Sequence, residues 1–155
     1  MADVPVGVFL SGGLDSRIIS YYVSRHKKLK SFSIGFNEPG YDESEHAHYV
    51  AKILGTEHYS EQFTPRDVIE IFGDVSKKMD EPFSDASIIP TYKVNKLASR
   101  YVKVVLSGDG GDELFGGYPT YQAHIISKYF AFLPDSSLEG MKKLVDIFPD
   151  AILDL

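Results

Sequence analysis

The sequence predicts an α/β fold: a three-layer, twisted, mostly parallel sheet with helices on both faces. Apolar runs of strand length alternate with segments of helical periodicity along most of the chain. The first run, Val6 to Leu10, is continuously apolar, as expected for a strand that is covered on both faces. Two glycine-rich segments follow predicted strands, where open α/β sheets bind their ligands.

The first half of the chain predicts three strands and two helices. Ser11-Gly12-Gly13 ends the first strand, and a helix is expected from about Leu14, with an apolar face formed by Ile18, Ile19, Tyr22 and Val23. Residues 29–36 predict a second strand and residues 42–54 a helix, which Gly55 is suited to end because glycine accepts the left-handed conformation. Residues 57–63 predict a third strand.

The second half begins with a clear helix start. Thr64 is an N-cap, Pro65 fits the first turn and Asp67 completes a capping box; the apolar face comprises Val68, Phe72, Val75 and Met79. A helix over 89–99, a strand over 102–106 and a glycine-rich segment over 107–117 follow. Helices are expected over 121–132 and 138–148, so we divide the chain into a core, 1–121, and a helical C-terminal segment, 122–155.

Composition excludes several classes of protein. The 155 residues carry a net charge of −6, and an acidic chain does not offer the basic surface that binds nucleic acid. The absence of cysteine excludes disulfides, cysteine-ligated zinc and a thiol nucleophile. No apolar run approaches the ~20 residues of a membrane helix, and no signal peptide is recognisable, so the expected location is the cytoplasm. His46 and His48 do not have the spacing of a metal pair, and His58 looks isolated.

The segment from Ser11 to Ser16 is the first candidate site. Its glycines let the backbone approach a ligand closely, and the free N–H groups at a helix start favour an anion such as phosphate. Asp15 would repel bare phosphate but fits a site in which Mg²⁺ bridges the carboxylate and phosphate oxygens. The segment lacks the spacing and the lysine of a Walker A loop. The alternative is a glycine turn that is merely capped by Ser and Asp.

Ser-Gly-Gly-Leu-Asp-Ser resembles the pyrophosphate loop of the N-type ATP pyrophosphatases, also called the PP-loop family. The resemblance implies cleavage of ATP between its α and β phosphates, an adenylated intermediate, and the adenine nucleotide alpha hydrolase-like fold. Within this family the chain is most similar to asparagine synthetases. The segments that carry that similarity are the lead-in over 3–10 and, above all, the second loop, 107–118, together with Ser33 to Phe36, Tyr41-Asp42-Glu43 and Asp80-Glu81-Pro82.

The resemblance assigns roles to individual residues. ATP and pyrophosphate would be bound by Leu10, Ser11, Gly12, Gly13, Leu14, Asp15, Ser16, Ile34, Ser107 and Gly108. Asp15 and Asp112 would share Mg²⁺, as carboxylates from different strands commonly do. Asp109 would orient ammonia or take a proton from it. These three acids, Asp15, Asp109 and Asp112, are the expected catalytic residues. Glu43 reads as part of an acidic helix start. Arg17 stands where the family usually has a small hydroxyl residue.

The implied reaction is activation of aspartate by ATP to β-aspartyl-AMP, followed by amidation with ammonia to asparagine. Ammonia would be free or supplied by a glutaminase domain or subunit, and a homo-oligomer is another expectation. Three alternatives stay open: another amide ligase of the β-lactam synthetase type, a non-catalytic nucleotide-binding fragment, and a scaffold that self-associates through an exposed apolar face.

Overall fold

The computed structural model describes residues 3–26, 28–38, 40, 42–81 and 84–130, and the chain divides into two units, Met1–Gly110 and Gly111–Leu155. The first unit contains β1 (Val6–Phe9), α1 (Leu14–Ser24), β2 (Lys30–Phe36), α2 (Ser44–Leu54), β3 (Glu57–Phe63), α3 (Pro65–Ser76), α4 (Ile88–Ala98) and β4 (Val104–Leu106). The second contains α5 (Gly111–Phe115) and α6 (Pro119–Phe130). The predicted helix over 138–148 lies outside the described residues.

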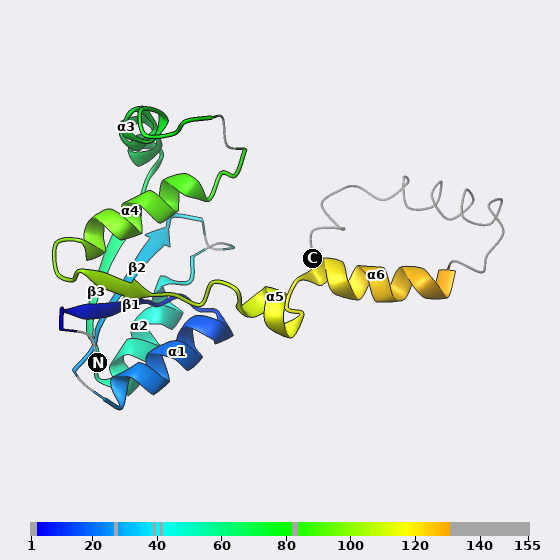
Figure 1. Ribbon diagram of the computed structural model, residues 1–155, viewed down its shortest axis with the longest axis horizontal. Coiled ribbons are helices and arrows are strands. Elements are labelled where there is room, and N and C mark those ends of the chain that lie inside the picture. The colour runs from blue at the N-terminus through cyan, green and yellow to red at the C-terminus, as the bar shows by residue number, and fades with distance from the viewer. Residues whose placement is uncertain (1–2, 27, 39, 41, 82–83, 131–155) are drawn as a thin grey trace. The chain divides into compact units, whose positions relative to one another are not determined.

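The four strands form one parallel sheet in the order β3-β2-β1-β4 (Figure 1). β1 lies between β2 and β4, with Val8 opposite Ser31 on one side and Leu106 on the other. The predicted parallel α/β sheet is therefore confirmed. Because β1 and β4 are parallel neighbours, the segments that follow them leave the sheet at the same edge.

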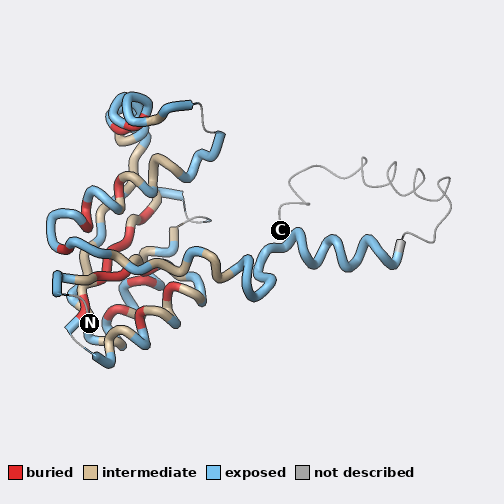
Figure 2. Tube along the Cα trace, viewed as in Figure 1, coloured by how far each residue is buried: buried red, intermediate tan, exposed pale blue. Residues whose placement is uncertain are grey.

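Helices cover both faces of this sheet. α1 and α2 pack on one face, and α4 packs on the other with α3 against it (Figure 1). Phe32, Leu97, Ala98 and Val102 form the core beneath α4, and Leu10, Ala47 and Ala51 form the core beneath α2. These buried residues follow the sheet and the inner sides of the helices (Figure 2).

The buried face of α1 differs from the predicted one. Ser16 and Ser20 are the buried residues of this helix, and the Ser20 hydroxyl donates to the Ser16 carbonyl at 2.7 Å. Ile18 and Tyr22, which were expected on the apolar face, are 45% and 61% exposed. The prediction was wrong for these two because small serines that satisfy their own hydroxyls occupy the inner side of the helix.

The expected helix ends are confirmed at two sites. Thr64 and Asp67 form the capping box at the start of α3, and Gly55 ends α2 with a φ of 65°. The Asp67 carboxylate has a further partner that the sequence did not indicate, because Lys93 Nζ of α4 lies 2.7 Å from its Oδ1. This ion pair joins α3 to α4.

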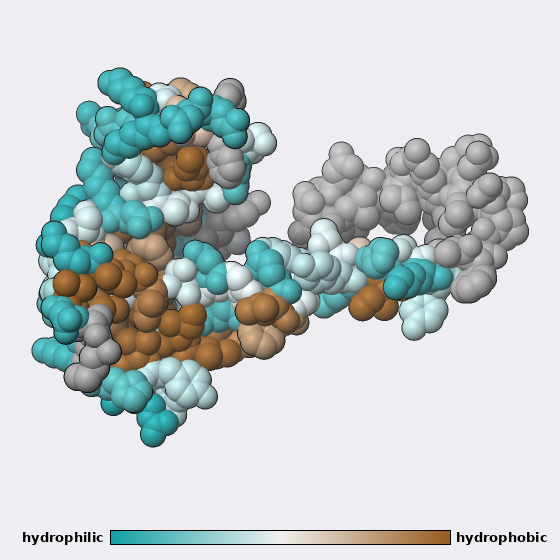
Figure 3. All heavy atoms as spheres, viewed as in Figure 1, coloured by the Kyte–Doolittle hydropathy of each residue, from teal (hydrophilic) through white to brown (hydrophobic). Residues whose placement is uncertain are grey.

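β4 is an edge strand with exposed apolar side chains. Val104 and Leu106 are 41% and 40% exposed, and Leu14 at the start of α1 is 69% exposed. Brown surface gathers over this part of the first unit in Figure 3. An uncovered apolar edge is a site at which further polypeptide readily pairs.

In the second unit, α6 matches the predicted helix over 121–132 as far as residue 130, and α5 was not predicted. The short α5 occupies the glycine-rich segment, in which Gly110 and Gly116 have φ values of 89° and 70°. In the described part of the chain, every helix is too short or too polar to cross a bilayer.

Candidate functional site

The first loop connects β1 to α1 and is held by its two serines. Ser16 Oγ accepts the Ser11 N–H at 3.2 Å, lies 2.9 Å from Ser11 Oγ, and is close to the Gly13 carbonyl at 3.1 Å. The Gly13 N–H donates in turn to Ser11 Oγ at 3.1 Å. These contacts close the six-residue segment into a tight turn, so Ser11 and Ser16 shape the loop in addition to any contact they make with a ligand.

The start of the second loop, at Gly108, lies directly against the first loop. A Cβ atom at Gly108 would lie 2.8 Å from Ser16 N, 3.0 Å from Asp15 Cβ and 3.1 Å from Asp15 C. No residue other than glycine fits there without displacing backbone. The structure therefore brings Ser107 and Gly108, which follow β4, to the start of α1, which follows β1.

Two carboxylates of the first unit belong to these loops. Asp109 Oδ2 accepts the Ser107 hydroxyl at 2.7 Å, which folds the acid back over its own loop. Within the described residues, no hydrogen bond or ion pair engages the Asp15 carboxylate. A carboxylate is the type of ligand that Mg²⁺ takes, one or two at a time, together with phosphate oxygens and water.

Asp112 lies in the second unit, in the first turn of α5. A Cβ at Gly117 would overlap Asp112 Oδ1, and the Gly117 N–H donates to the Asp112 carbonyl at 3.0 Å, so the carboxylate packs against the turn that ends α5. Next to it, Glu113 accepts the Tyr118 hydroxyl at 2.8 Å, which raises the pKa of Tyr118 to about 12. The pairing of Asp112 with Asp15 around one ion stays a prediction.

Another acid, Glu43, contacts the first loop, and sequence reasoning did not place it in the site. The Gly12 N–H donates to Glu43 Oε2 at 2.9 Å, across 31 positions of the sequence. A Cβ at Gly12 would lie 3.0 Å from Glu43 Cδ, so the side chain also packs over the glycine. The signals in the sequence were the acidic run after β2, which reads equally well as an ordinary helix start, and the resemblance of Tyr41-Asp42-Glu43 to the family.

Glu43 is placed by its neighbour Asp42. Asp42 Oδ1 accepts the N–H groups of Phe36 and Ser44 at 3.2 and 3.1 Å, and Oδ2 accepts the Ser44 hydroxyl at 3.0 Å. The hydrogen bonds from Ser44, followed by that from Phe36, lower the pKa of the Asp42 carboxyl. Asp42 therefore ties the end of β2 to the start of α2, and Glu43 projects from this junction.

Of the other residues assigned to ATP, Leu10 and Ile34 differ in exposure. Leu10 is 2% exposed and packs in the core beneath α2, and its N–H donates to the Phe32 carbonyl at 2.9 Å, so its side chain is not available to a ligand. Ile34, in β2, is half-buried. Leu14 is exposed at the first position of α1, and Arg17 Nε is buried without a hydrogen-bond partner among the described residues.

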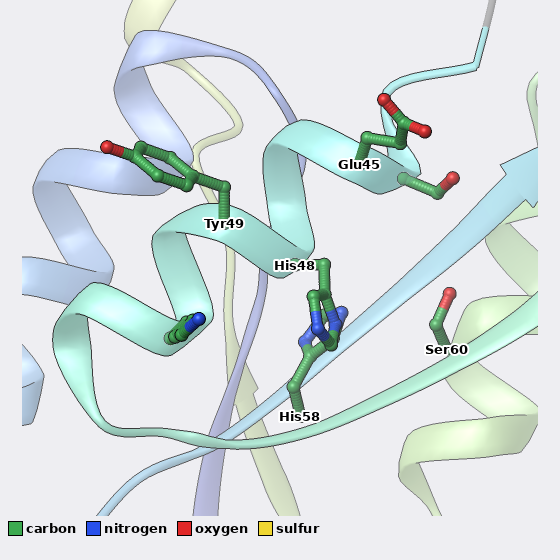
Figure 4. A pocket seen from close by; sticks show the side chains of 7 residues that line it. Glu45, His48, Tyr49, His58 and Ser60 are labelled. Atoms are coloured by element: carbon green, nitrogen blue, oxygen red, sulfur yellow. The ribbon is translucent and has the colours of Figure 1, made fainter.

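His58 is not isolated, contrary to the sequence reading. Its ring lies 5.9 Å from that of His48, and both line a pocket along α2 and β3 (Figure 4). Ser31 Oγ lies 2.9 Å from His58 Nδ1 and Ser33 Oγ lies 3.2 Å from Nε2. Burial, and then the nearby His48, lower the pKa of His58. Among the described residues, no group of three or more His, Cys, Asp or Glu side chains is arranged to hold a metal ion.

The sequence is similar to those of known proteins of one family. The family profile described as Asparagine synthase matches residues 1–150. A protein of Methanocaldococcus jannaschii, provisionally named asparagine synthetase (glutamine-hydrolyzing) 2, is 47% identical over 139 residues, which are 85% of this chain and 27% of that protein. Asparagine synthetase (glutamine-hydrolyzing) 1 of Bacillus subtilis is 41% identical over 145 residues, which are 93% of this chain and 22% of that protein.

Among solved structures, NMN synthetase from Francisella tularensis superposes with a TM-score of 0.49 at 20% identity, covering 74% of this chain and 49% of that one. The chain spans about a quarter of the length of the curated relatives it matches. Because the family profile covers nearly the whole sequence, the chain belongs to the asparagine synthase family.

Proposed function

We propose that this chain is the nucleotide-activating core of an asparagine synthetase. A β-carboxylate oxygen of aspartate attacks the α-phosphorus of ATP, the bond to the β-phosphate breaks, and pyrophosphate leaves. Ammonia then attacks the acyl carbon of β-aspartyl-AMP, the bond to the phosphate oxygen breaks, and asparagine and AMP are formed with loss of a proton. The observation that supports the proposal is the close approach of Gly108, at the start of the second loop, to Asp15 and Ser16.

We assign the following roles to the residues of the two loops. The backbone N–H groups between Ser11 and Ser16 bind the leaving pyrophosphate, which helix N-termini favour. Ser107 and Gly108 bind the adenylate, and Asp109 holds the attacking ammonia or takes its proton. Asp15 and Asp112 would hold Mg²⁺, which would neutralise charge on the phosphates. The protein thus contributes mainly orientation and electrostatic stabilisation.

The remaining expectations concern the environment of the reaction. We propose that ammonia comes from a glutaminase domain or subunit, because the relatives are named glutamine-hydrolyzing. We also propose a cytoplasmic location, where ATP and aspartate are abundant, and a homo-oligomer as the assembled form.

The test is exchange of labelled pyrophosphate into ATP by the 155-residue chain, with and without aspartate. Exchange that requires aspartate and Mg²⁺, and that falls at least about 100-fold in Asp15→Asn, is the expected result. Asp74→Asn, which alters an exposed acid of α3, is the matched control and should retain exchange.

Other outcomes assign other functions. Exchange with a different carboxylate, but not with aspartate, would indicate an amide ligase of the β-lactam synthetase type. Binding of Mg-ATP in calorimetry without any exchange would limit this chain to nucleotide binding. Full exchange in Asp15→Asn would remove Asp15 from the site.

A further inference from the structure

The N–H groups at the start of the first loop are all engaged in this structure, but by partners of two kinds. Those of Ser11 and Gly13 donate to serine hydroxyls within the loop, at 3.2 and 3.1 Å. That of Gly12 donates to a carboxylate oxygen of Glu43, which comes from a different element. A hydroxyl can rotate to accommodate a ligand, whereas a carboxylate must leave before an anion takes its place.

The hydrogen bond between Gly12 and Glu43 can break while the backbone on both sides stays in place. The backbone of Glu43 is held in place, because its carbonyl accepts the Ala47 N–H of α2 at 2.9 Å and because Asp42 binds the N–H groups of Phe36 and Ser44. Its side chain is exposed and, among the described residues, makes no hydrogen bond other than the one from Gly12. The carboxylate can therefore swing into solvent without disturbing the β2–α2 junction.

A phosphate oxygen that accepts the Gly12 N–H needs the position that Glu43 Oε2 now occupies, 2.9 Å from the nitrogen. The two anions also repel each other at this distance. We propose that Glu43 is a resident anion of the phosphate loop, which pyrophosphate or the nucleotide must displace and which speeds product release by returning. This inference rests on the proposed function, since it concerns control of the same loop.

The experiment measures binding of inorganic pyrophosphate to the full chain by calorimetry. Glu43→Gln keeps the shape and an acceptor oxygen but removes the charge, and we expect it to bind pyrophosphate about fivefold more tightly or better, as expected for loss of a competing charged hydrogen bond. Glu45→Gln, two positions along on α2, is the matched control and should bind like the unaltered chain. The gain should shrink between about 0.05 and 0.5 M ionic strength, because salt screens an exposed repulsion.

A second measurement reports the contact without any ligand. The amide resonance of Gly12 should move in Glu43→Gln, stay in place in Glu45→Gln, and move on addition of pyrophosphate to the unaltered chain. Equal affinity in all three proteins would overturn the inference and leave the proposed function standing. Weaker binding in Glu43→Gln would also overturn it, since Glu43 would then support the loop. Absence of pyrophosphate binding in every protein would refute the inference together with the phosphate role of the loop.

Discussion

Replacement of Asp67 by asparagine tests how α3 is held against α4. Asp67 Oδ2 accepts the Thr64 N–H and hydroxyl at 2.7 and 2.6 Å, and Oδ1 pairs with Lys93 Nζ at 2.7 Å. Lys93 Nζ also donates to the Gln62 carbonyl at 2.5 Å. The side chain of Lys93 is 11% exposed and that of Asp67 is 21% exposed, so the pair is shielded from most of the solvent.

The pKa of Asp67 sets the size of the effect. The hydrogen bond from Lys93, followed by that from Thr64, lowers this pKa from 3.8 to about 2. At about 1.36 kcal/mol per pKa unit the difference corresponds to at most about 2.4 kcal/mol, which partial solvent contact reduces to about 1–2 kcal/mol. Because the folded-state pKa is depressed, this stability is present above pH 3.8 and is lost as the pH falls through about 2.

The assay is urea unfolding followed by circular dichroism at pH 7 and at successively lower pH. Asp67→Asn should lower the free energy of unfolding by about 1–2 kcal/mol at pH 7, and the difference from the unaltered chain should narrow as the pH approaches 2. Glu70→Gln is the control, since the side chains of the Arg66–Glu70 pair are 87% and 64% exposed and its removal should cost less than about 0.5 kcal/mol. The reasoning would be refuted if Asp67→Asn lowered the free energy of unfolding by less than about 0.5 kcal/mol at pH 7. It would also be refuted if the difference in free energy of unfolding between Asp67→Asn and the unaltered chain were the same at pH 7 and near pH 2.

Three further changes test the site and the sheet. Gly108→Ala places a Cβ 2.8 Å from Ser16 N, so it should lower the free energy of unfolding in urea by about 1–3 kcal/mol and weaken Mg-ATP binding in calorimetry. Gly73→Ala is the control, because a Cβ at Gly73 has open space, and it should have neither effect. Ser16→Ala removes the hydroxyl that closes the first loop and should weaken pyrophosphate binding several-fold, with Ser24→Ala, whose hydroxyl bonds only its own helix, as the control. The lowered pKa of His58 should reduce the free energy of unfolding as the pH falls below about 6.5, because the imidazole of the unfolded chain takes a proton before that of the folded chain. His58→Gln should make the free energy of unfolding fall less steeply between about pH 7.5 and pH 5.5. An unchanged slope would contradict this.

The local parts of the fold could be predicted because their signals are local. The range of β3, the capping box at Thr64 and the left-handed Gly55 are each specified by a few adjacent residues. The buried face of α1 was misassigned because periodicity ranks Ile18 and Tyr22 above serine, while packing put Ser16 and Ser20 inside. Side-chain hydrogen bonds within a helix make serine acceptable in a core, and hydropathy does not register them.

The candidate site divides in the same way. The order of residues alone determined that a glycine-rich turn with Asp15 and two serines follows a buried strand, since that chemistry lies within six consecutive positions. Only the tertiary structure decided that Gly108 lies against Asp15 and Ser16, and that Glu43 reaches Gly12. Those contacts depend on the parallel pairing of β1 with β4 and on the junction between β2 and α2, and they join segments far apart in the chain whose approach no local pattern records.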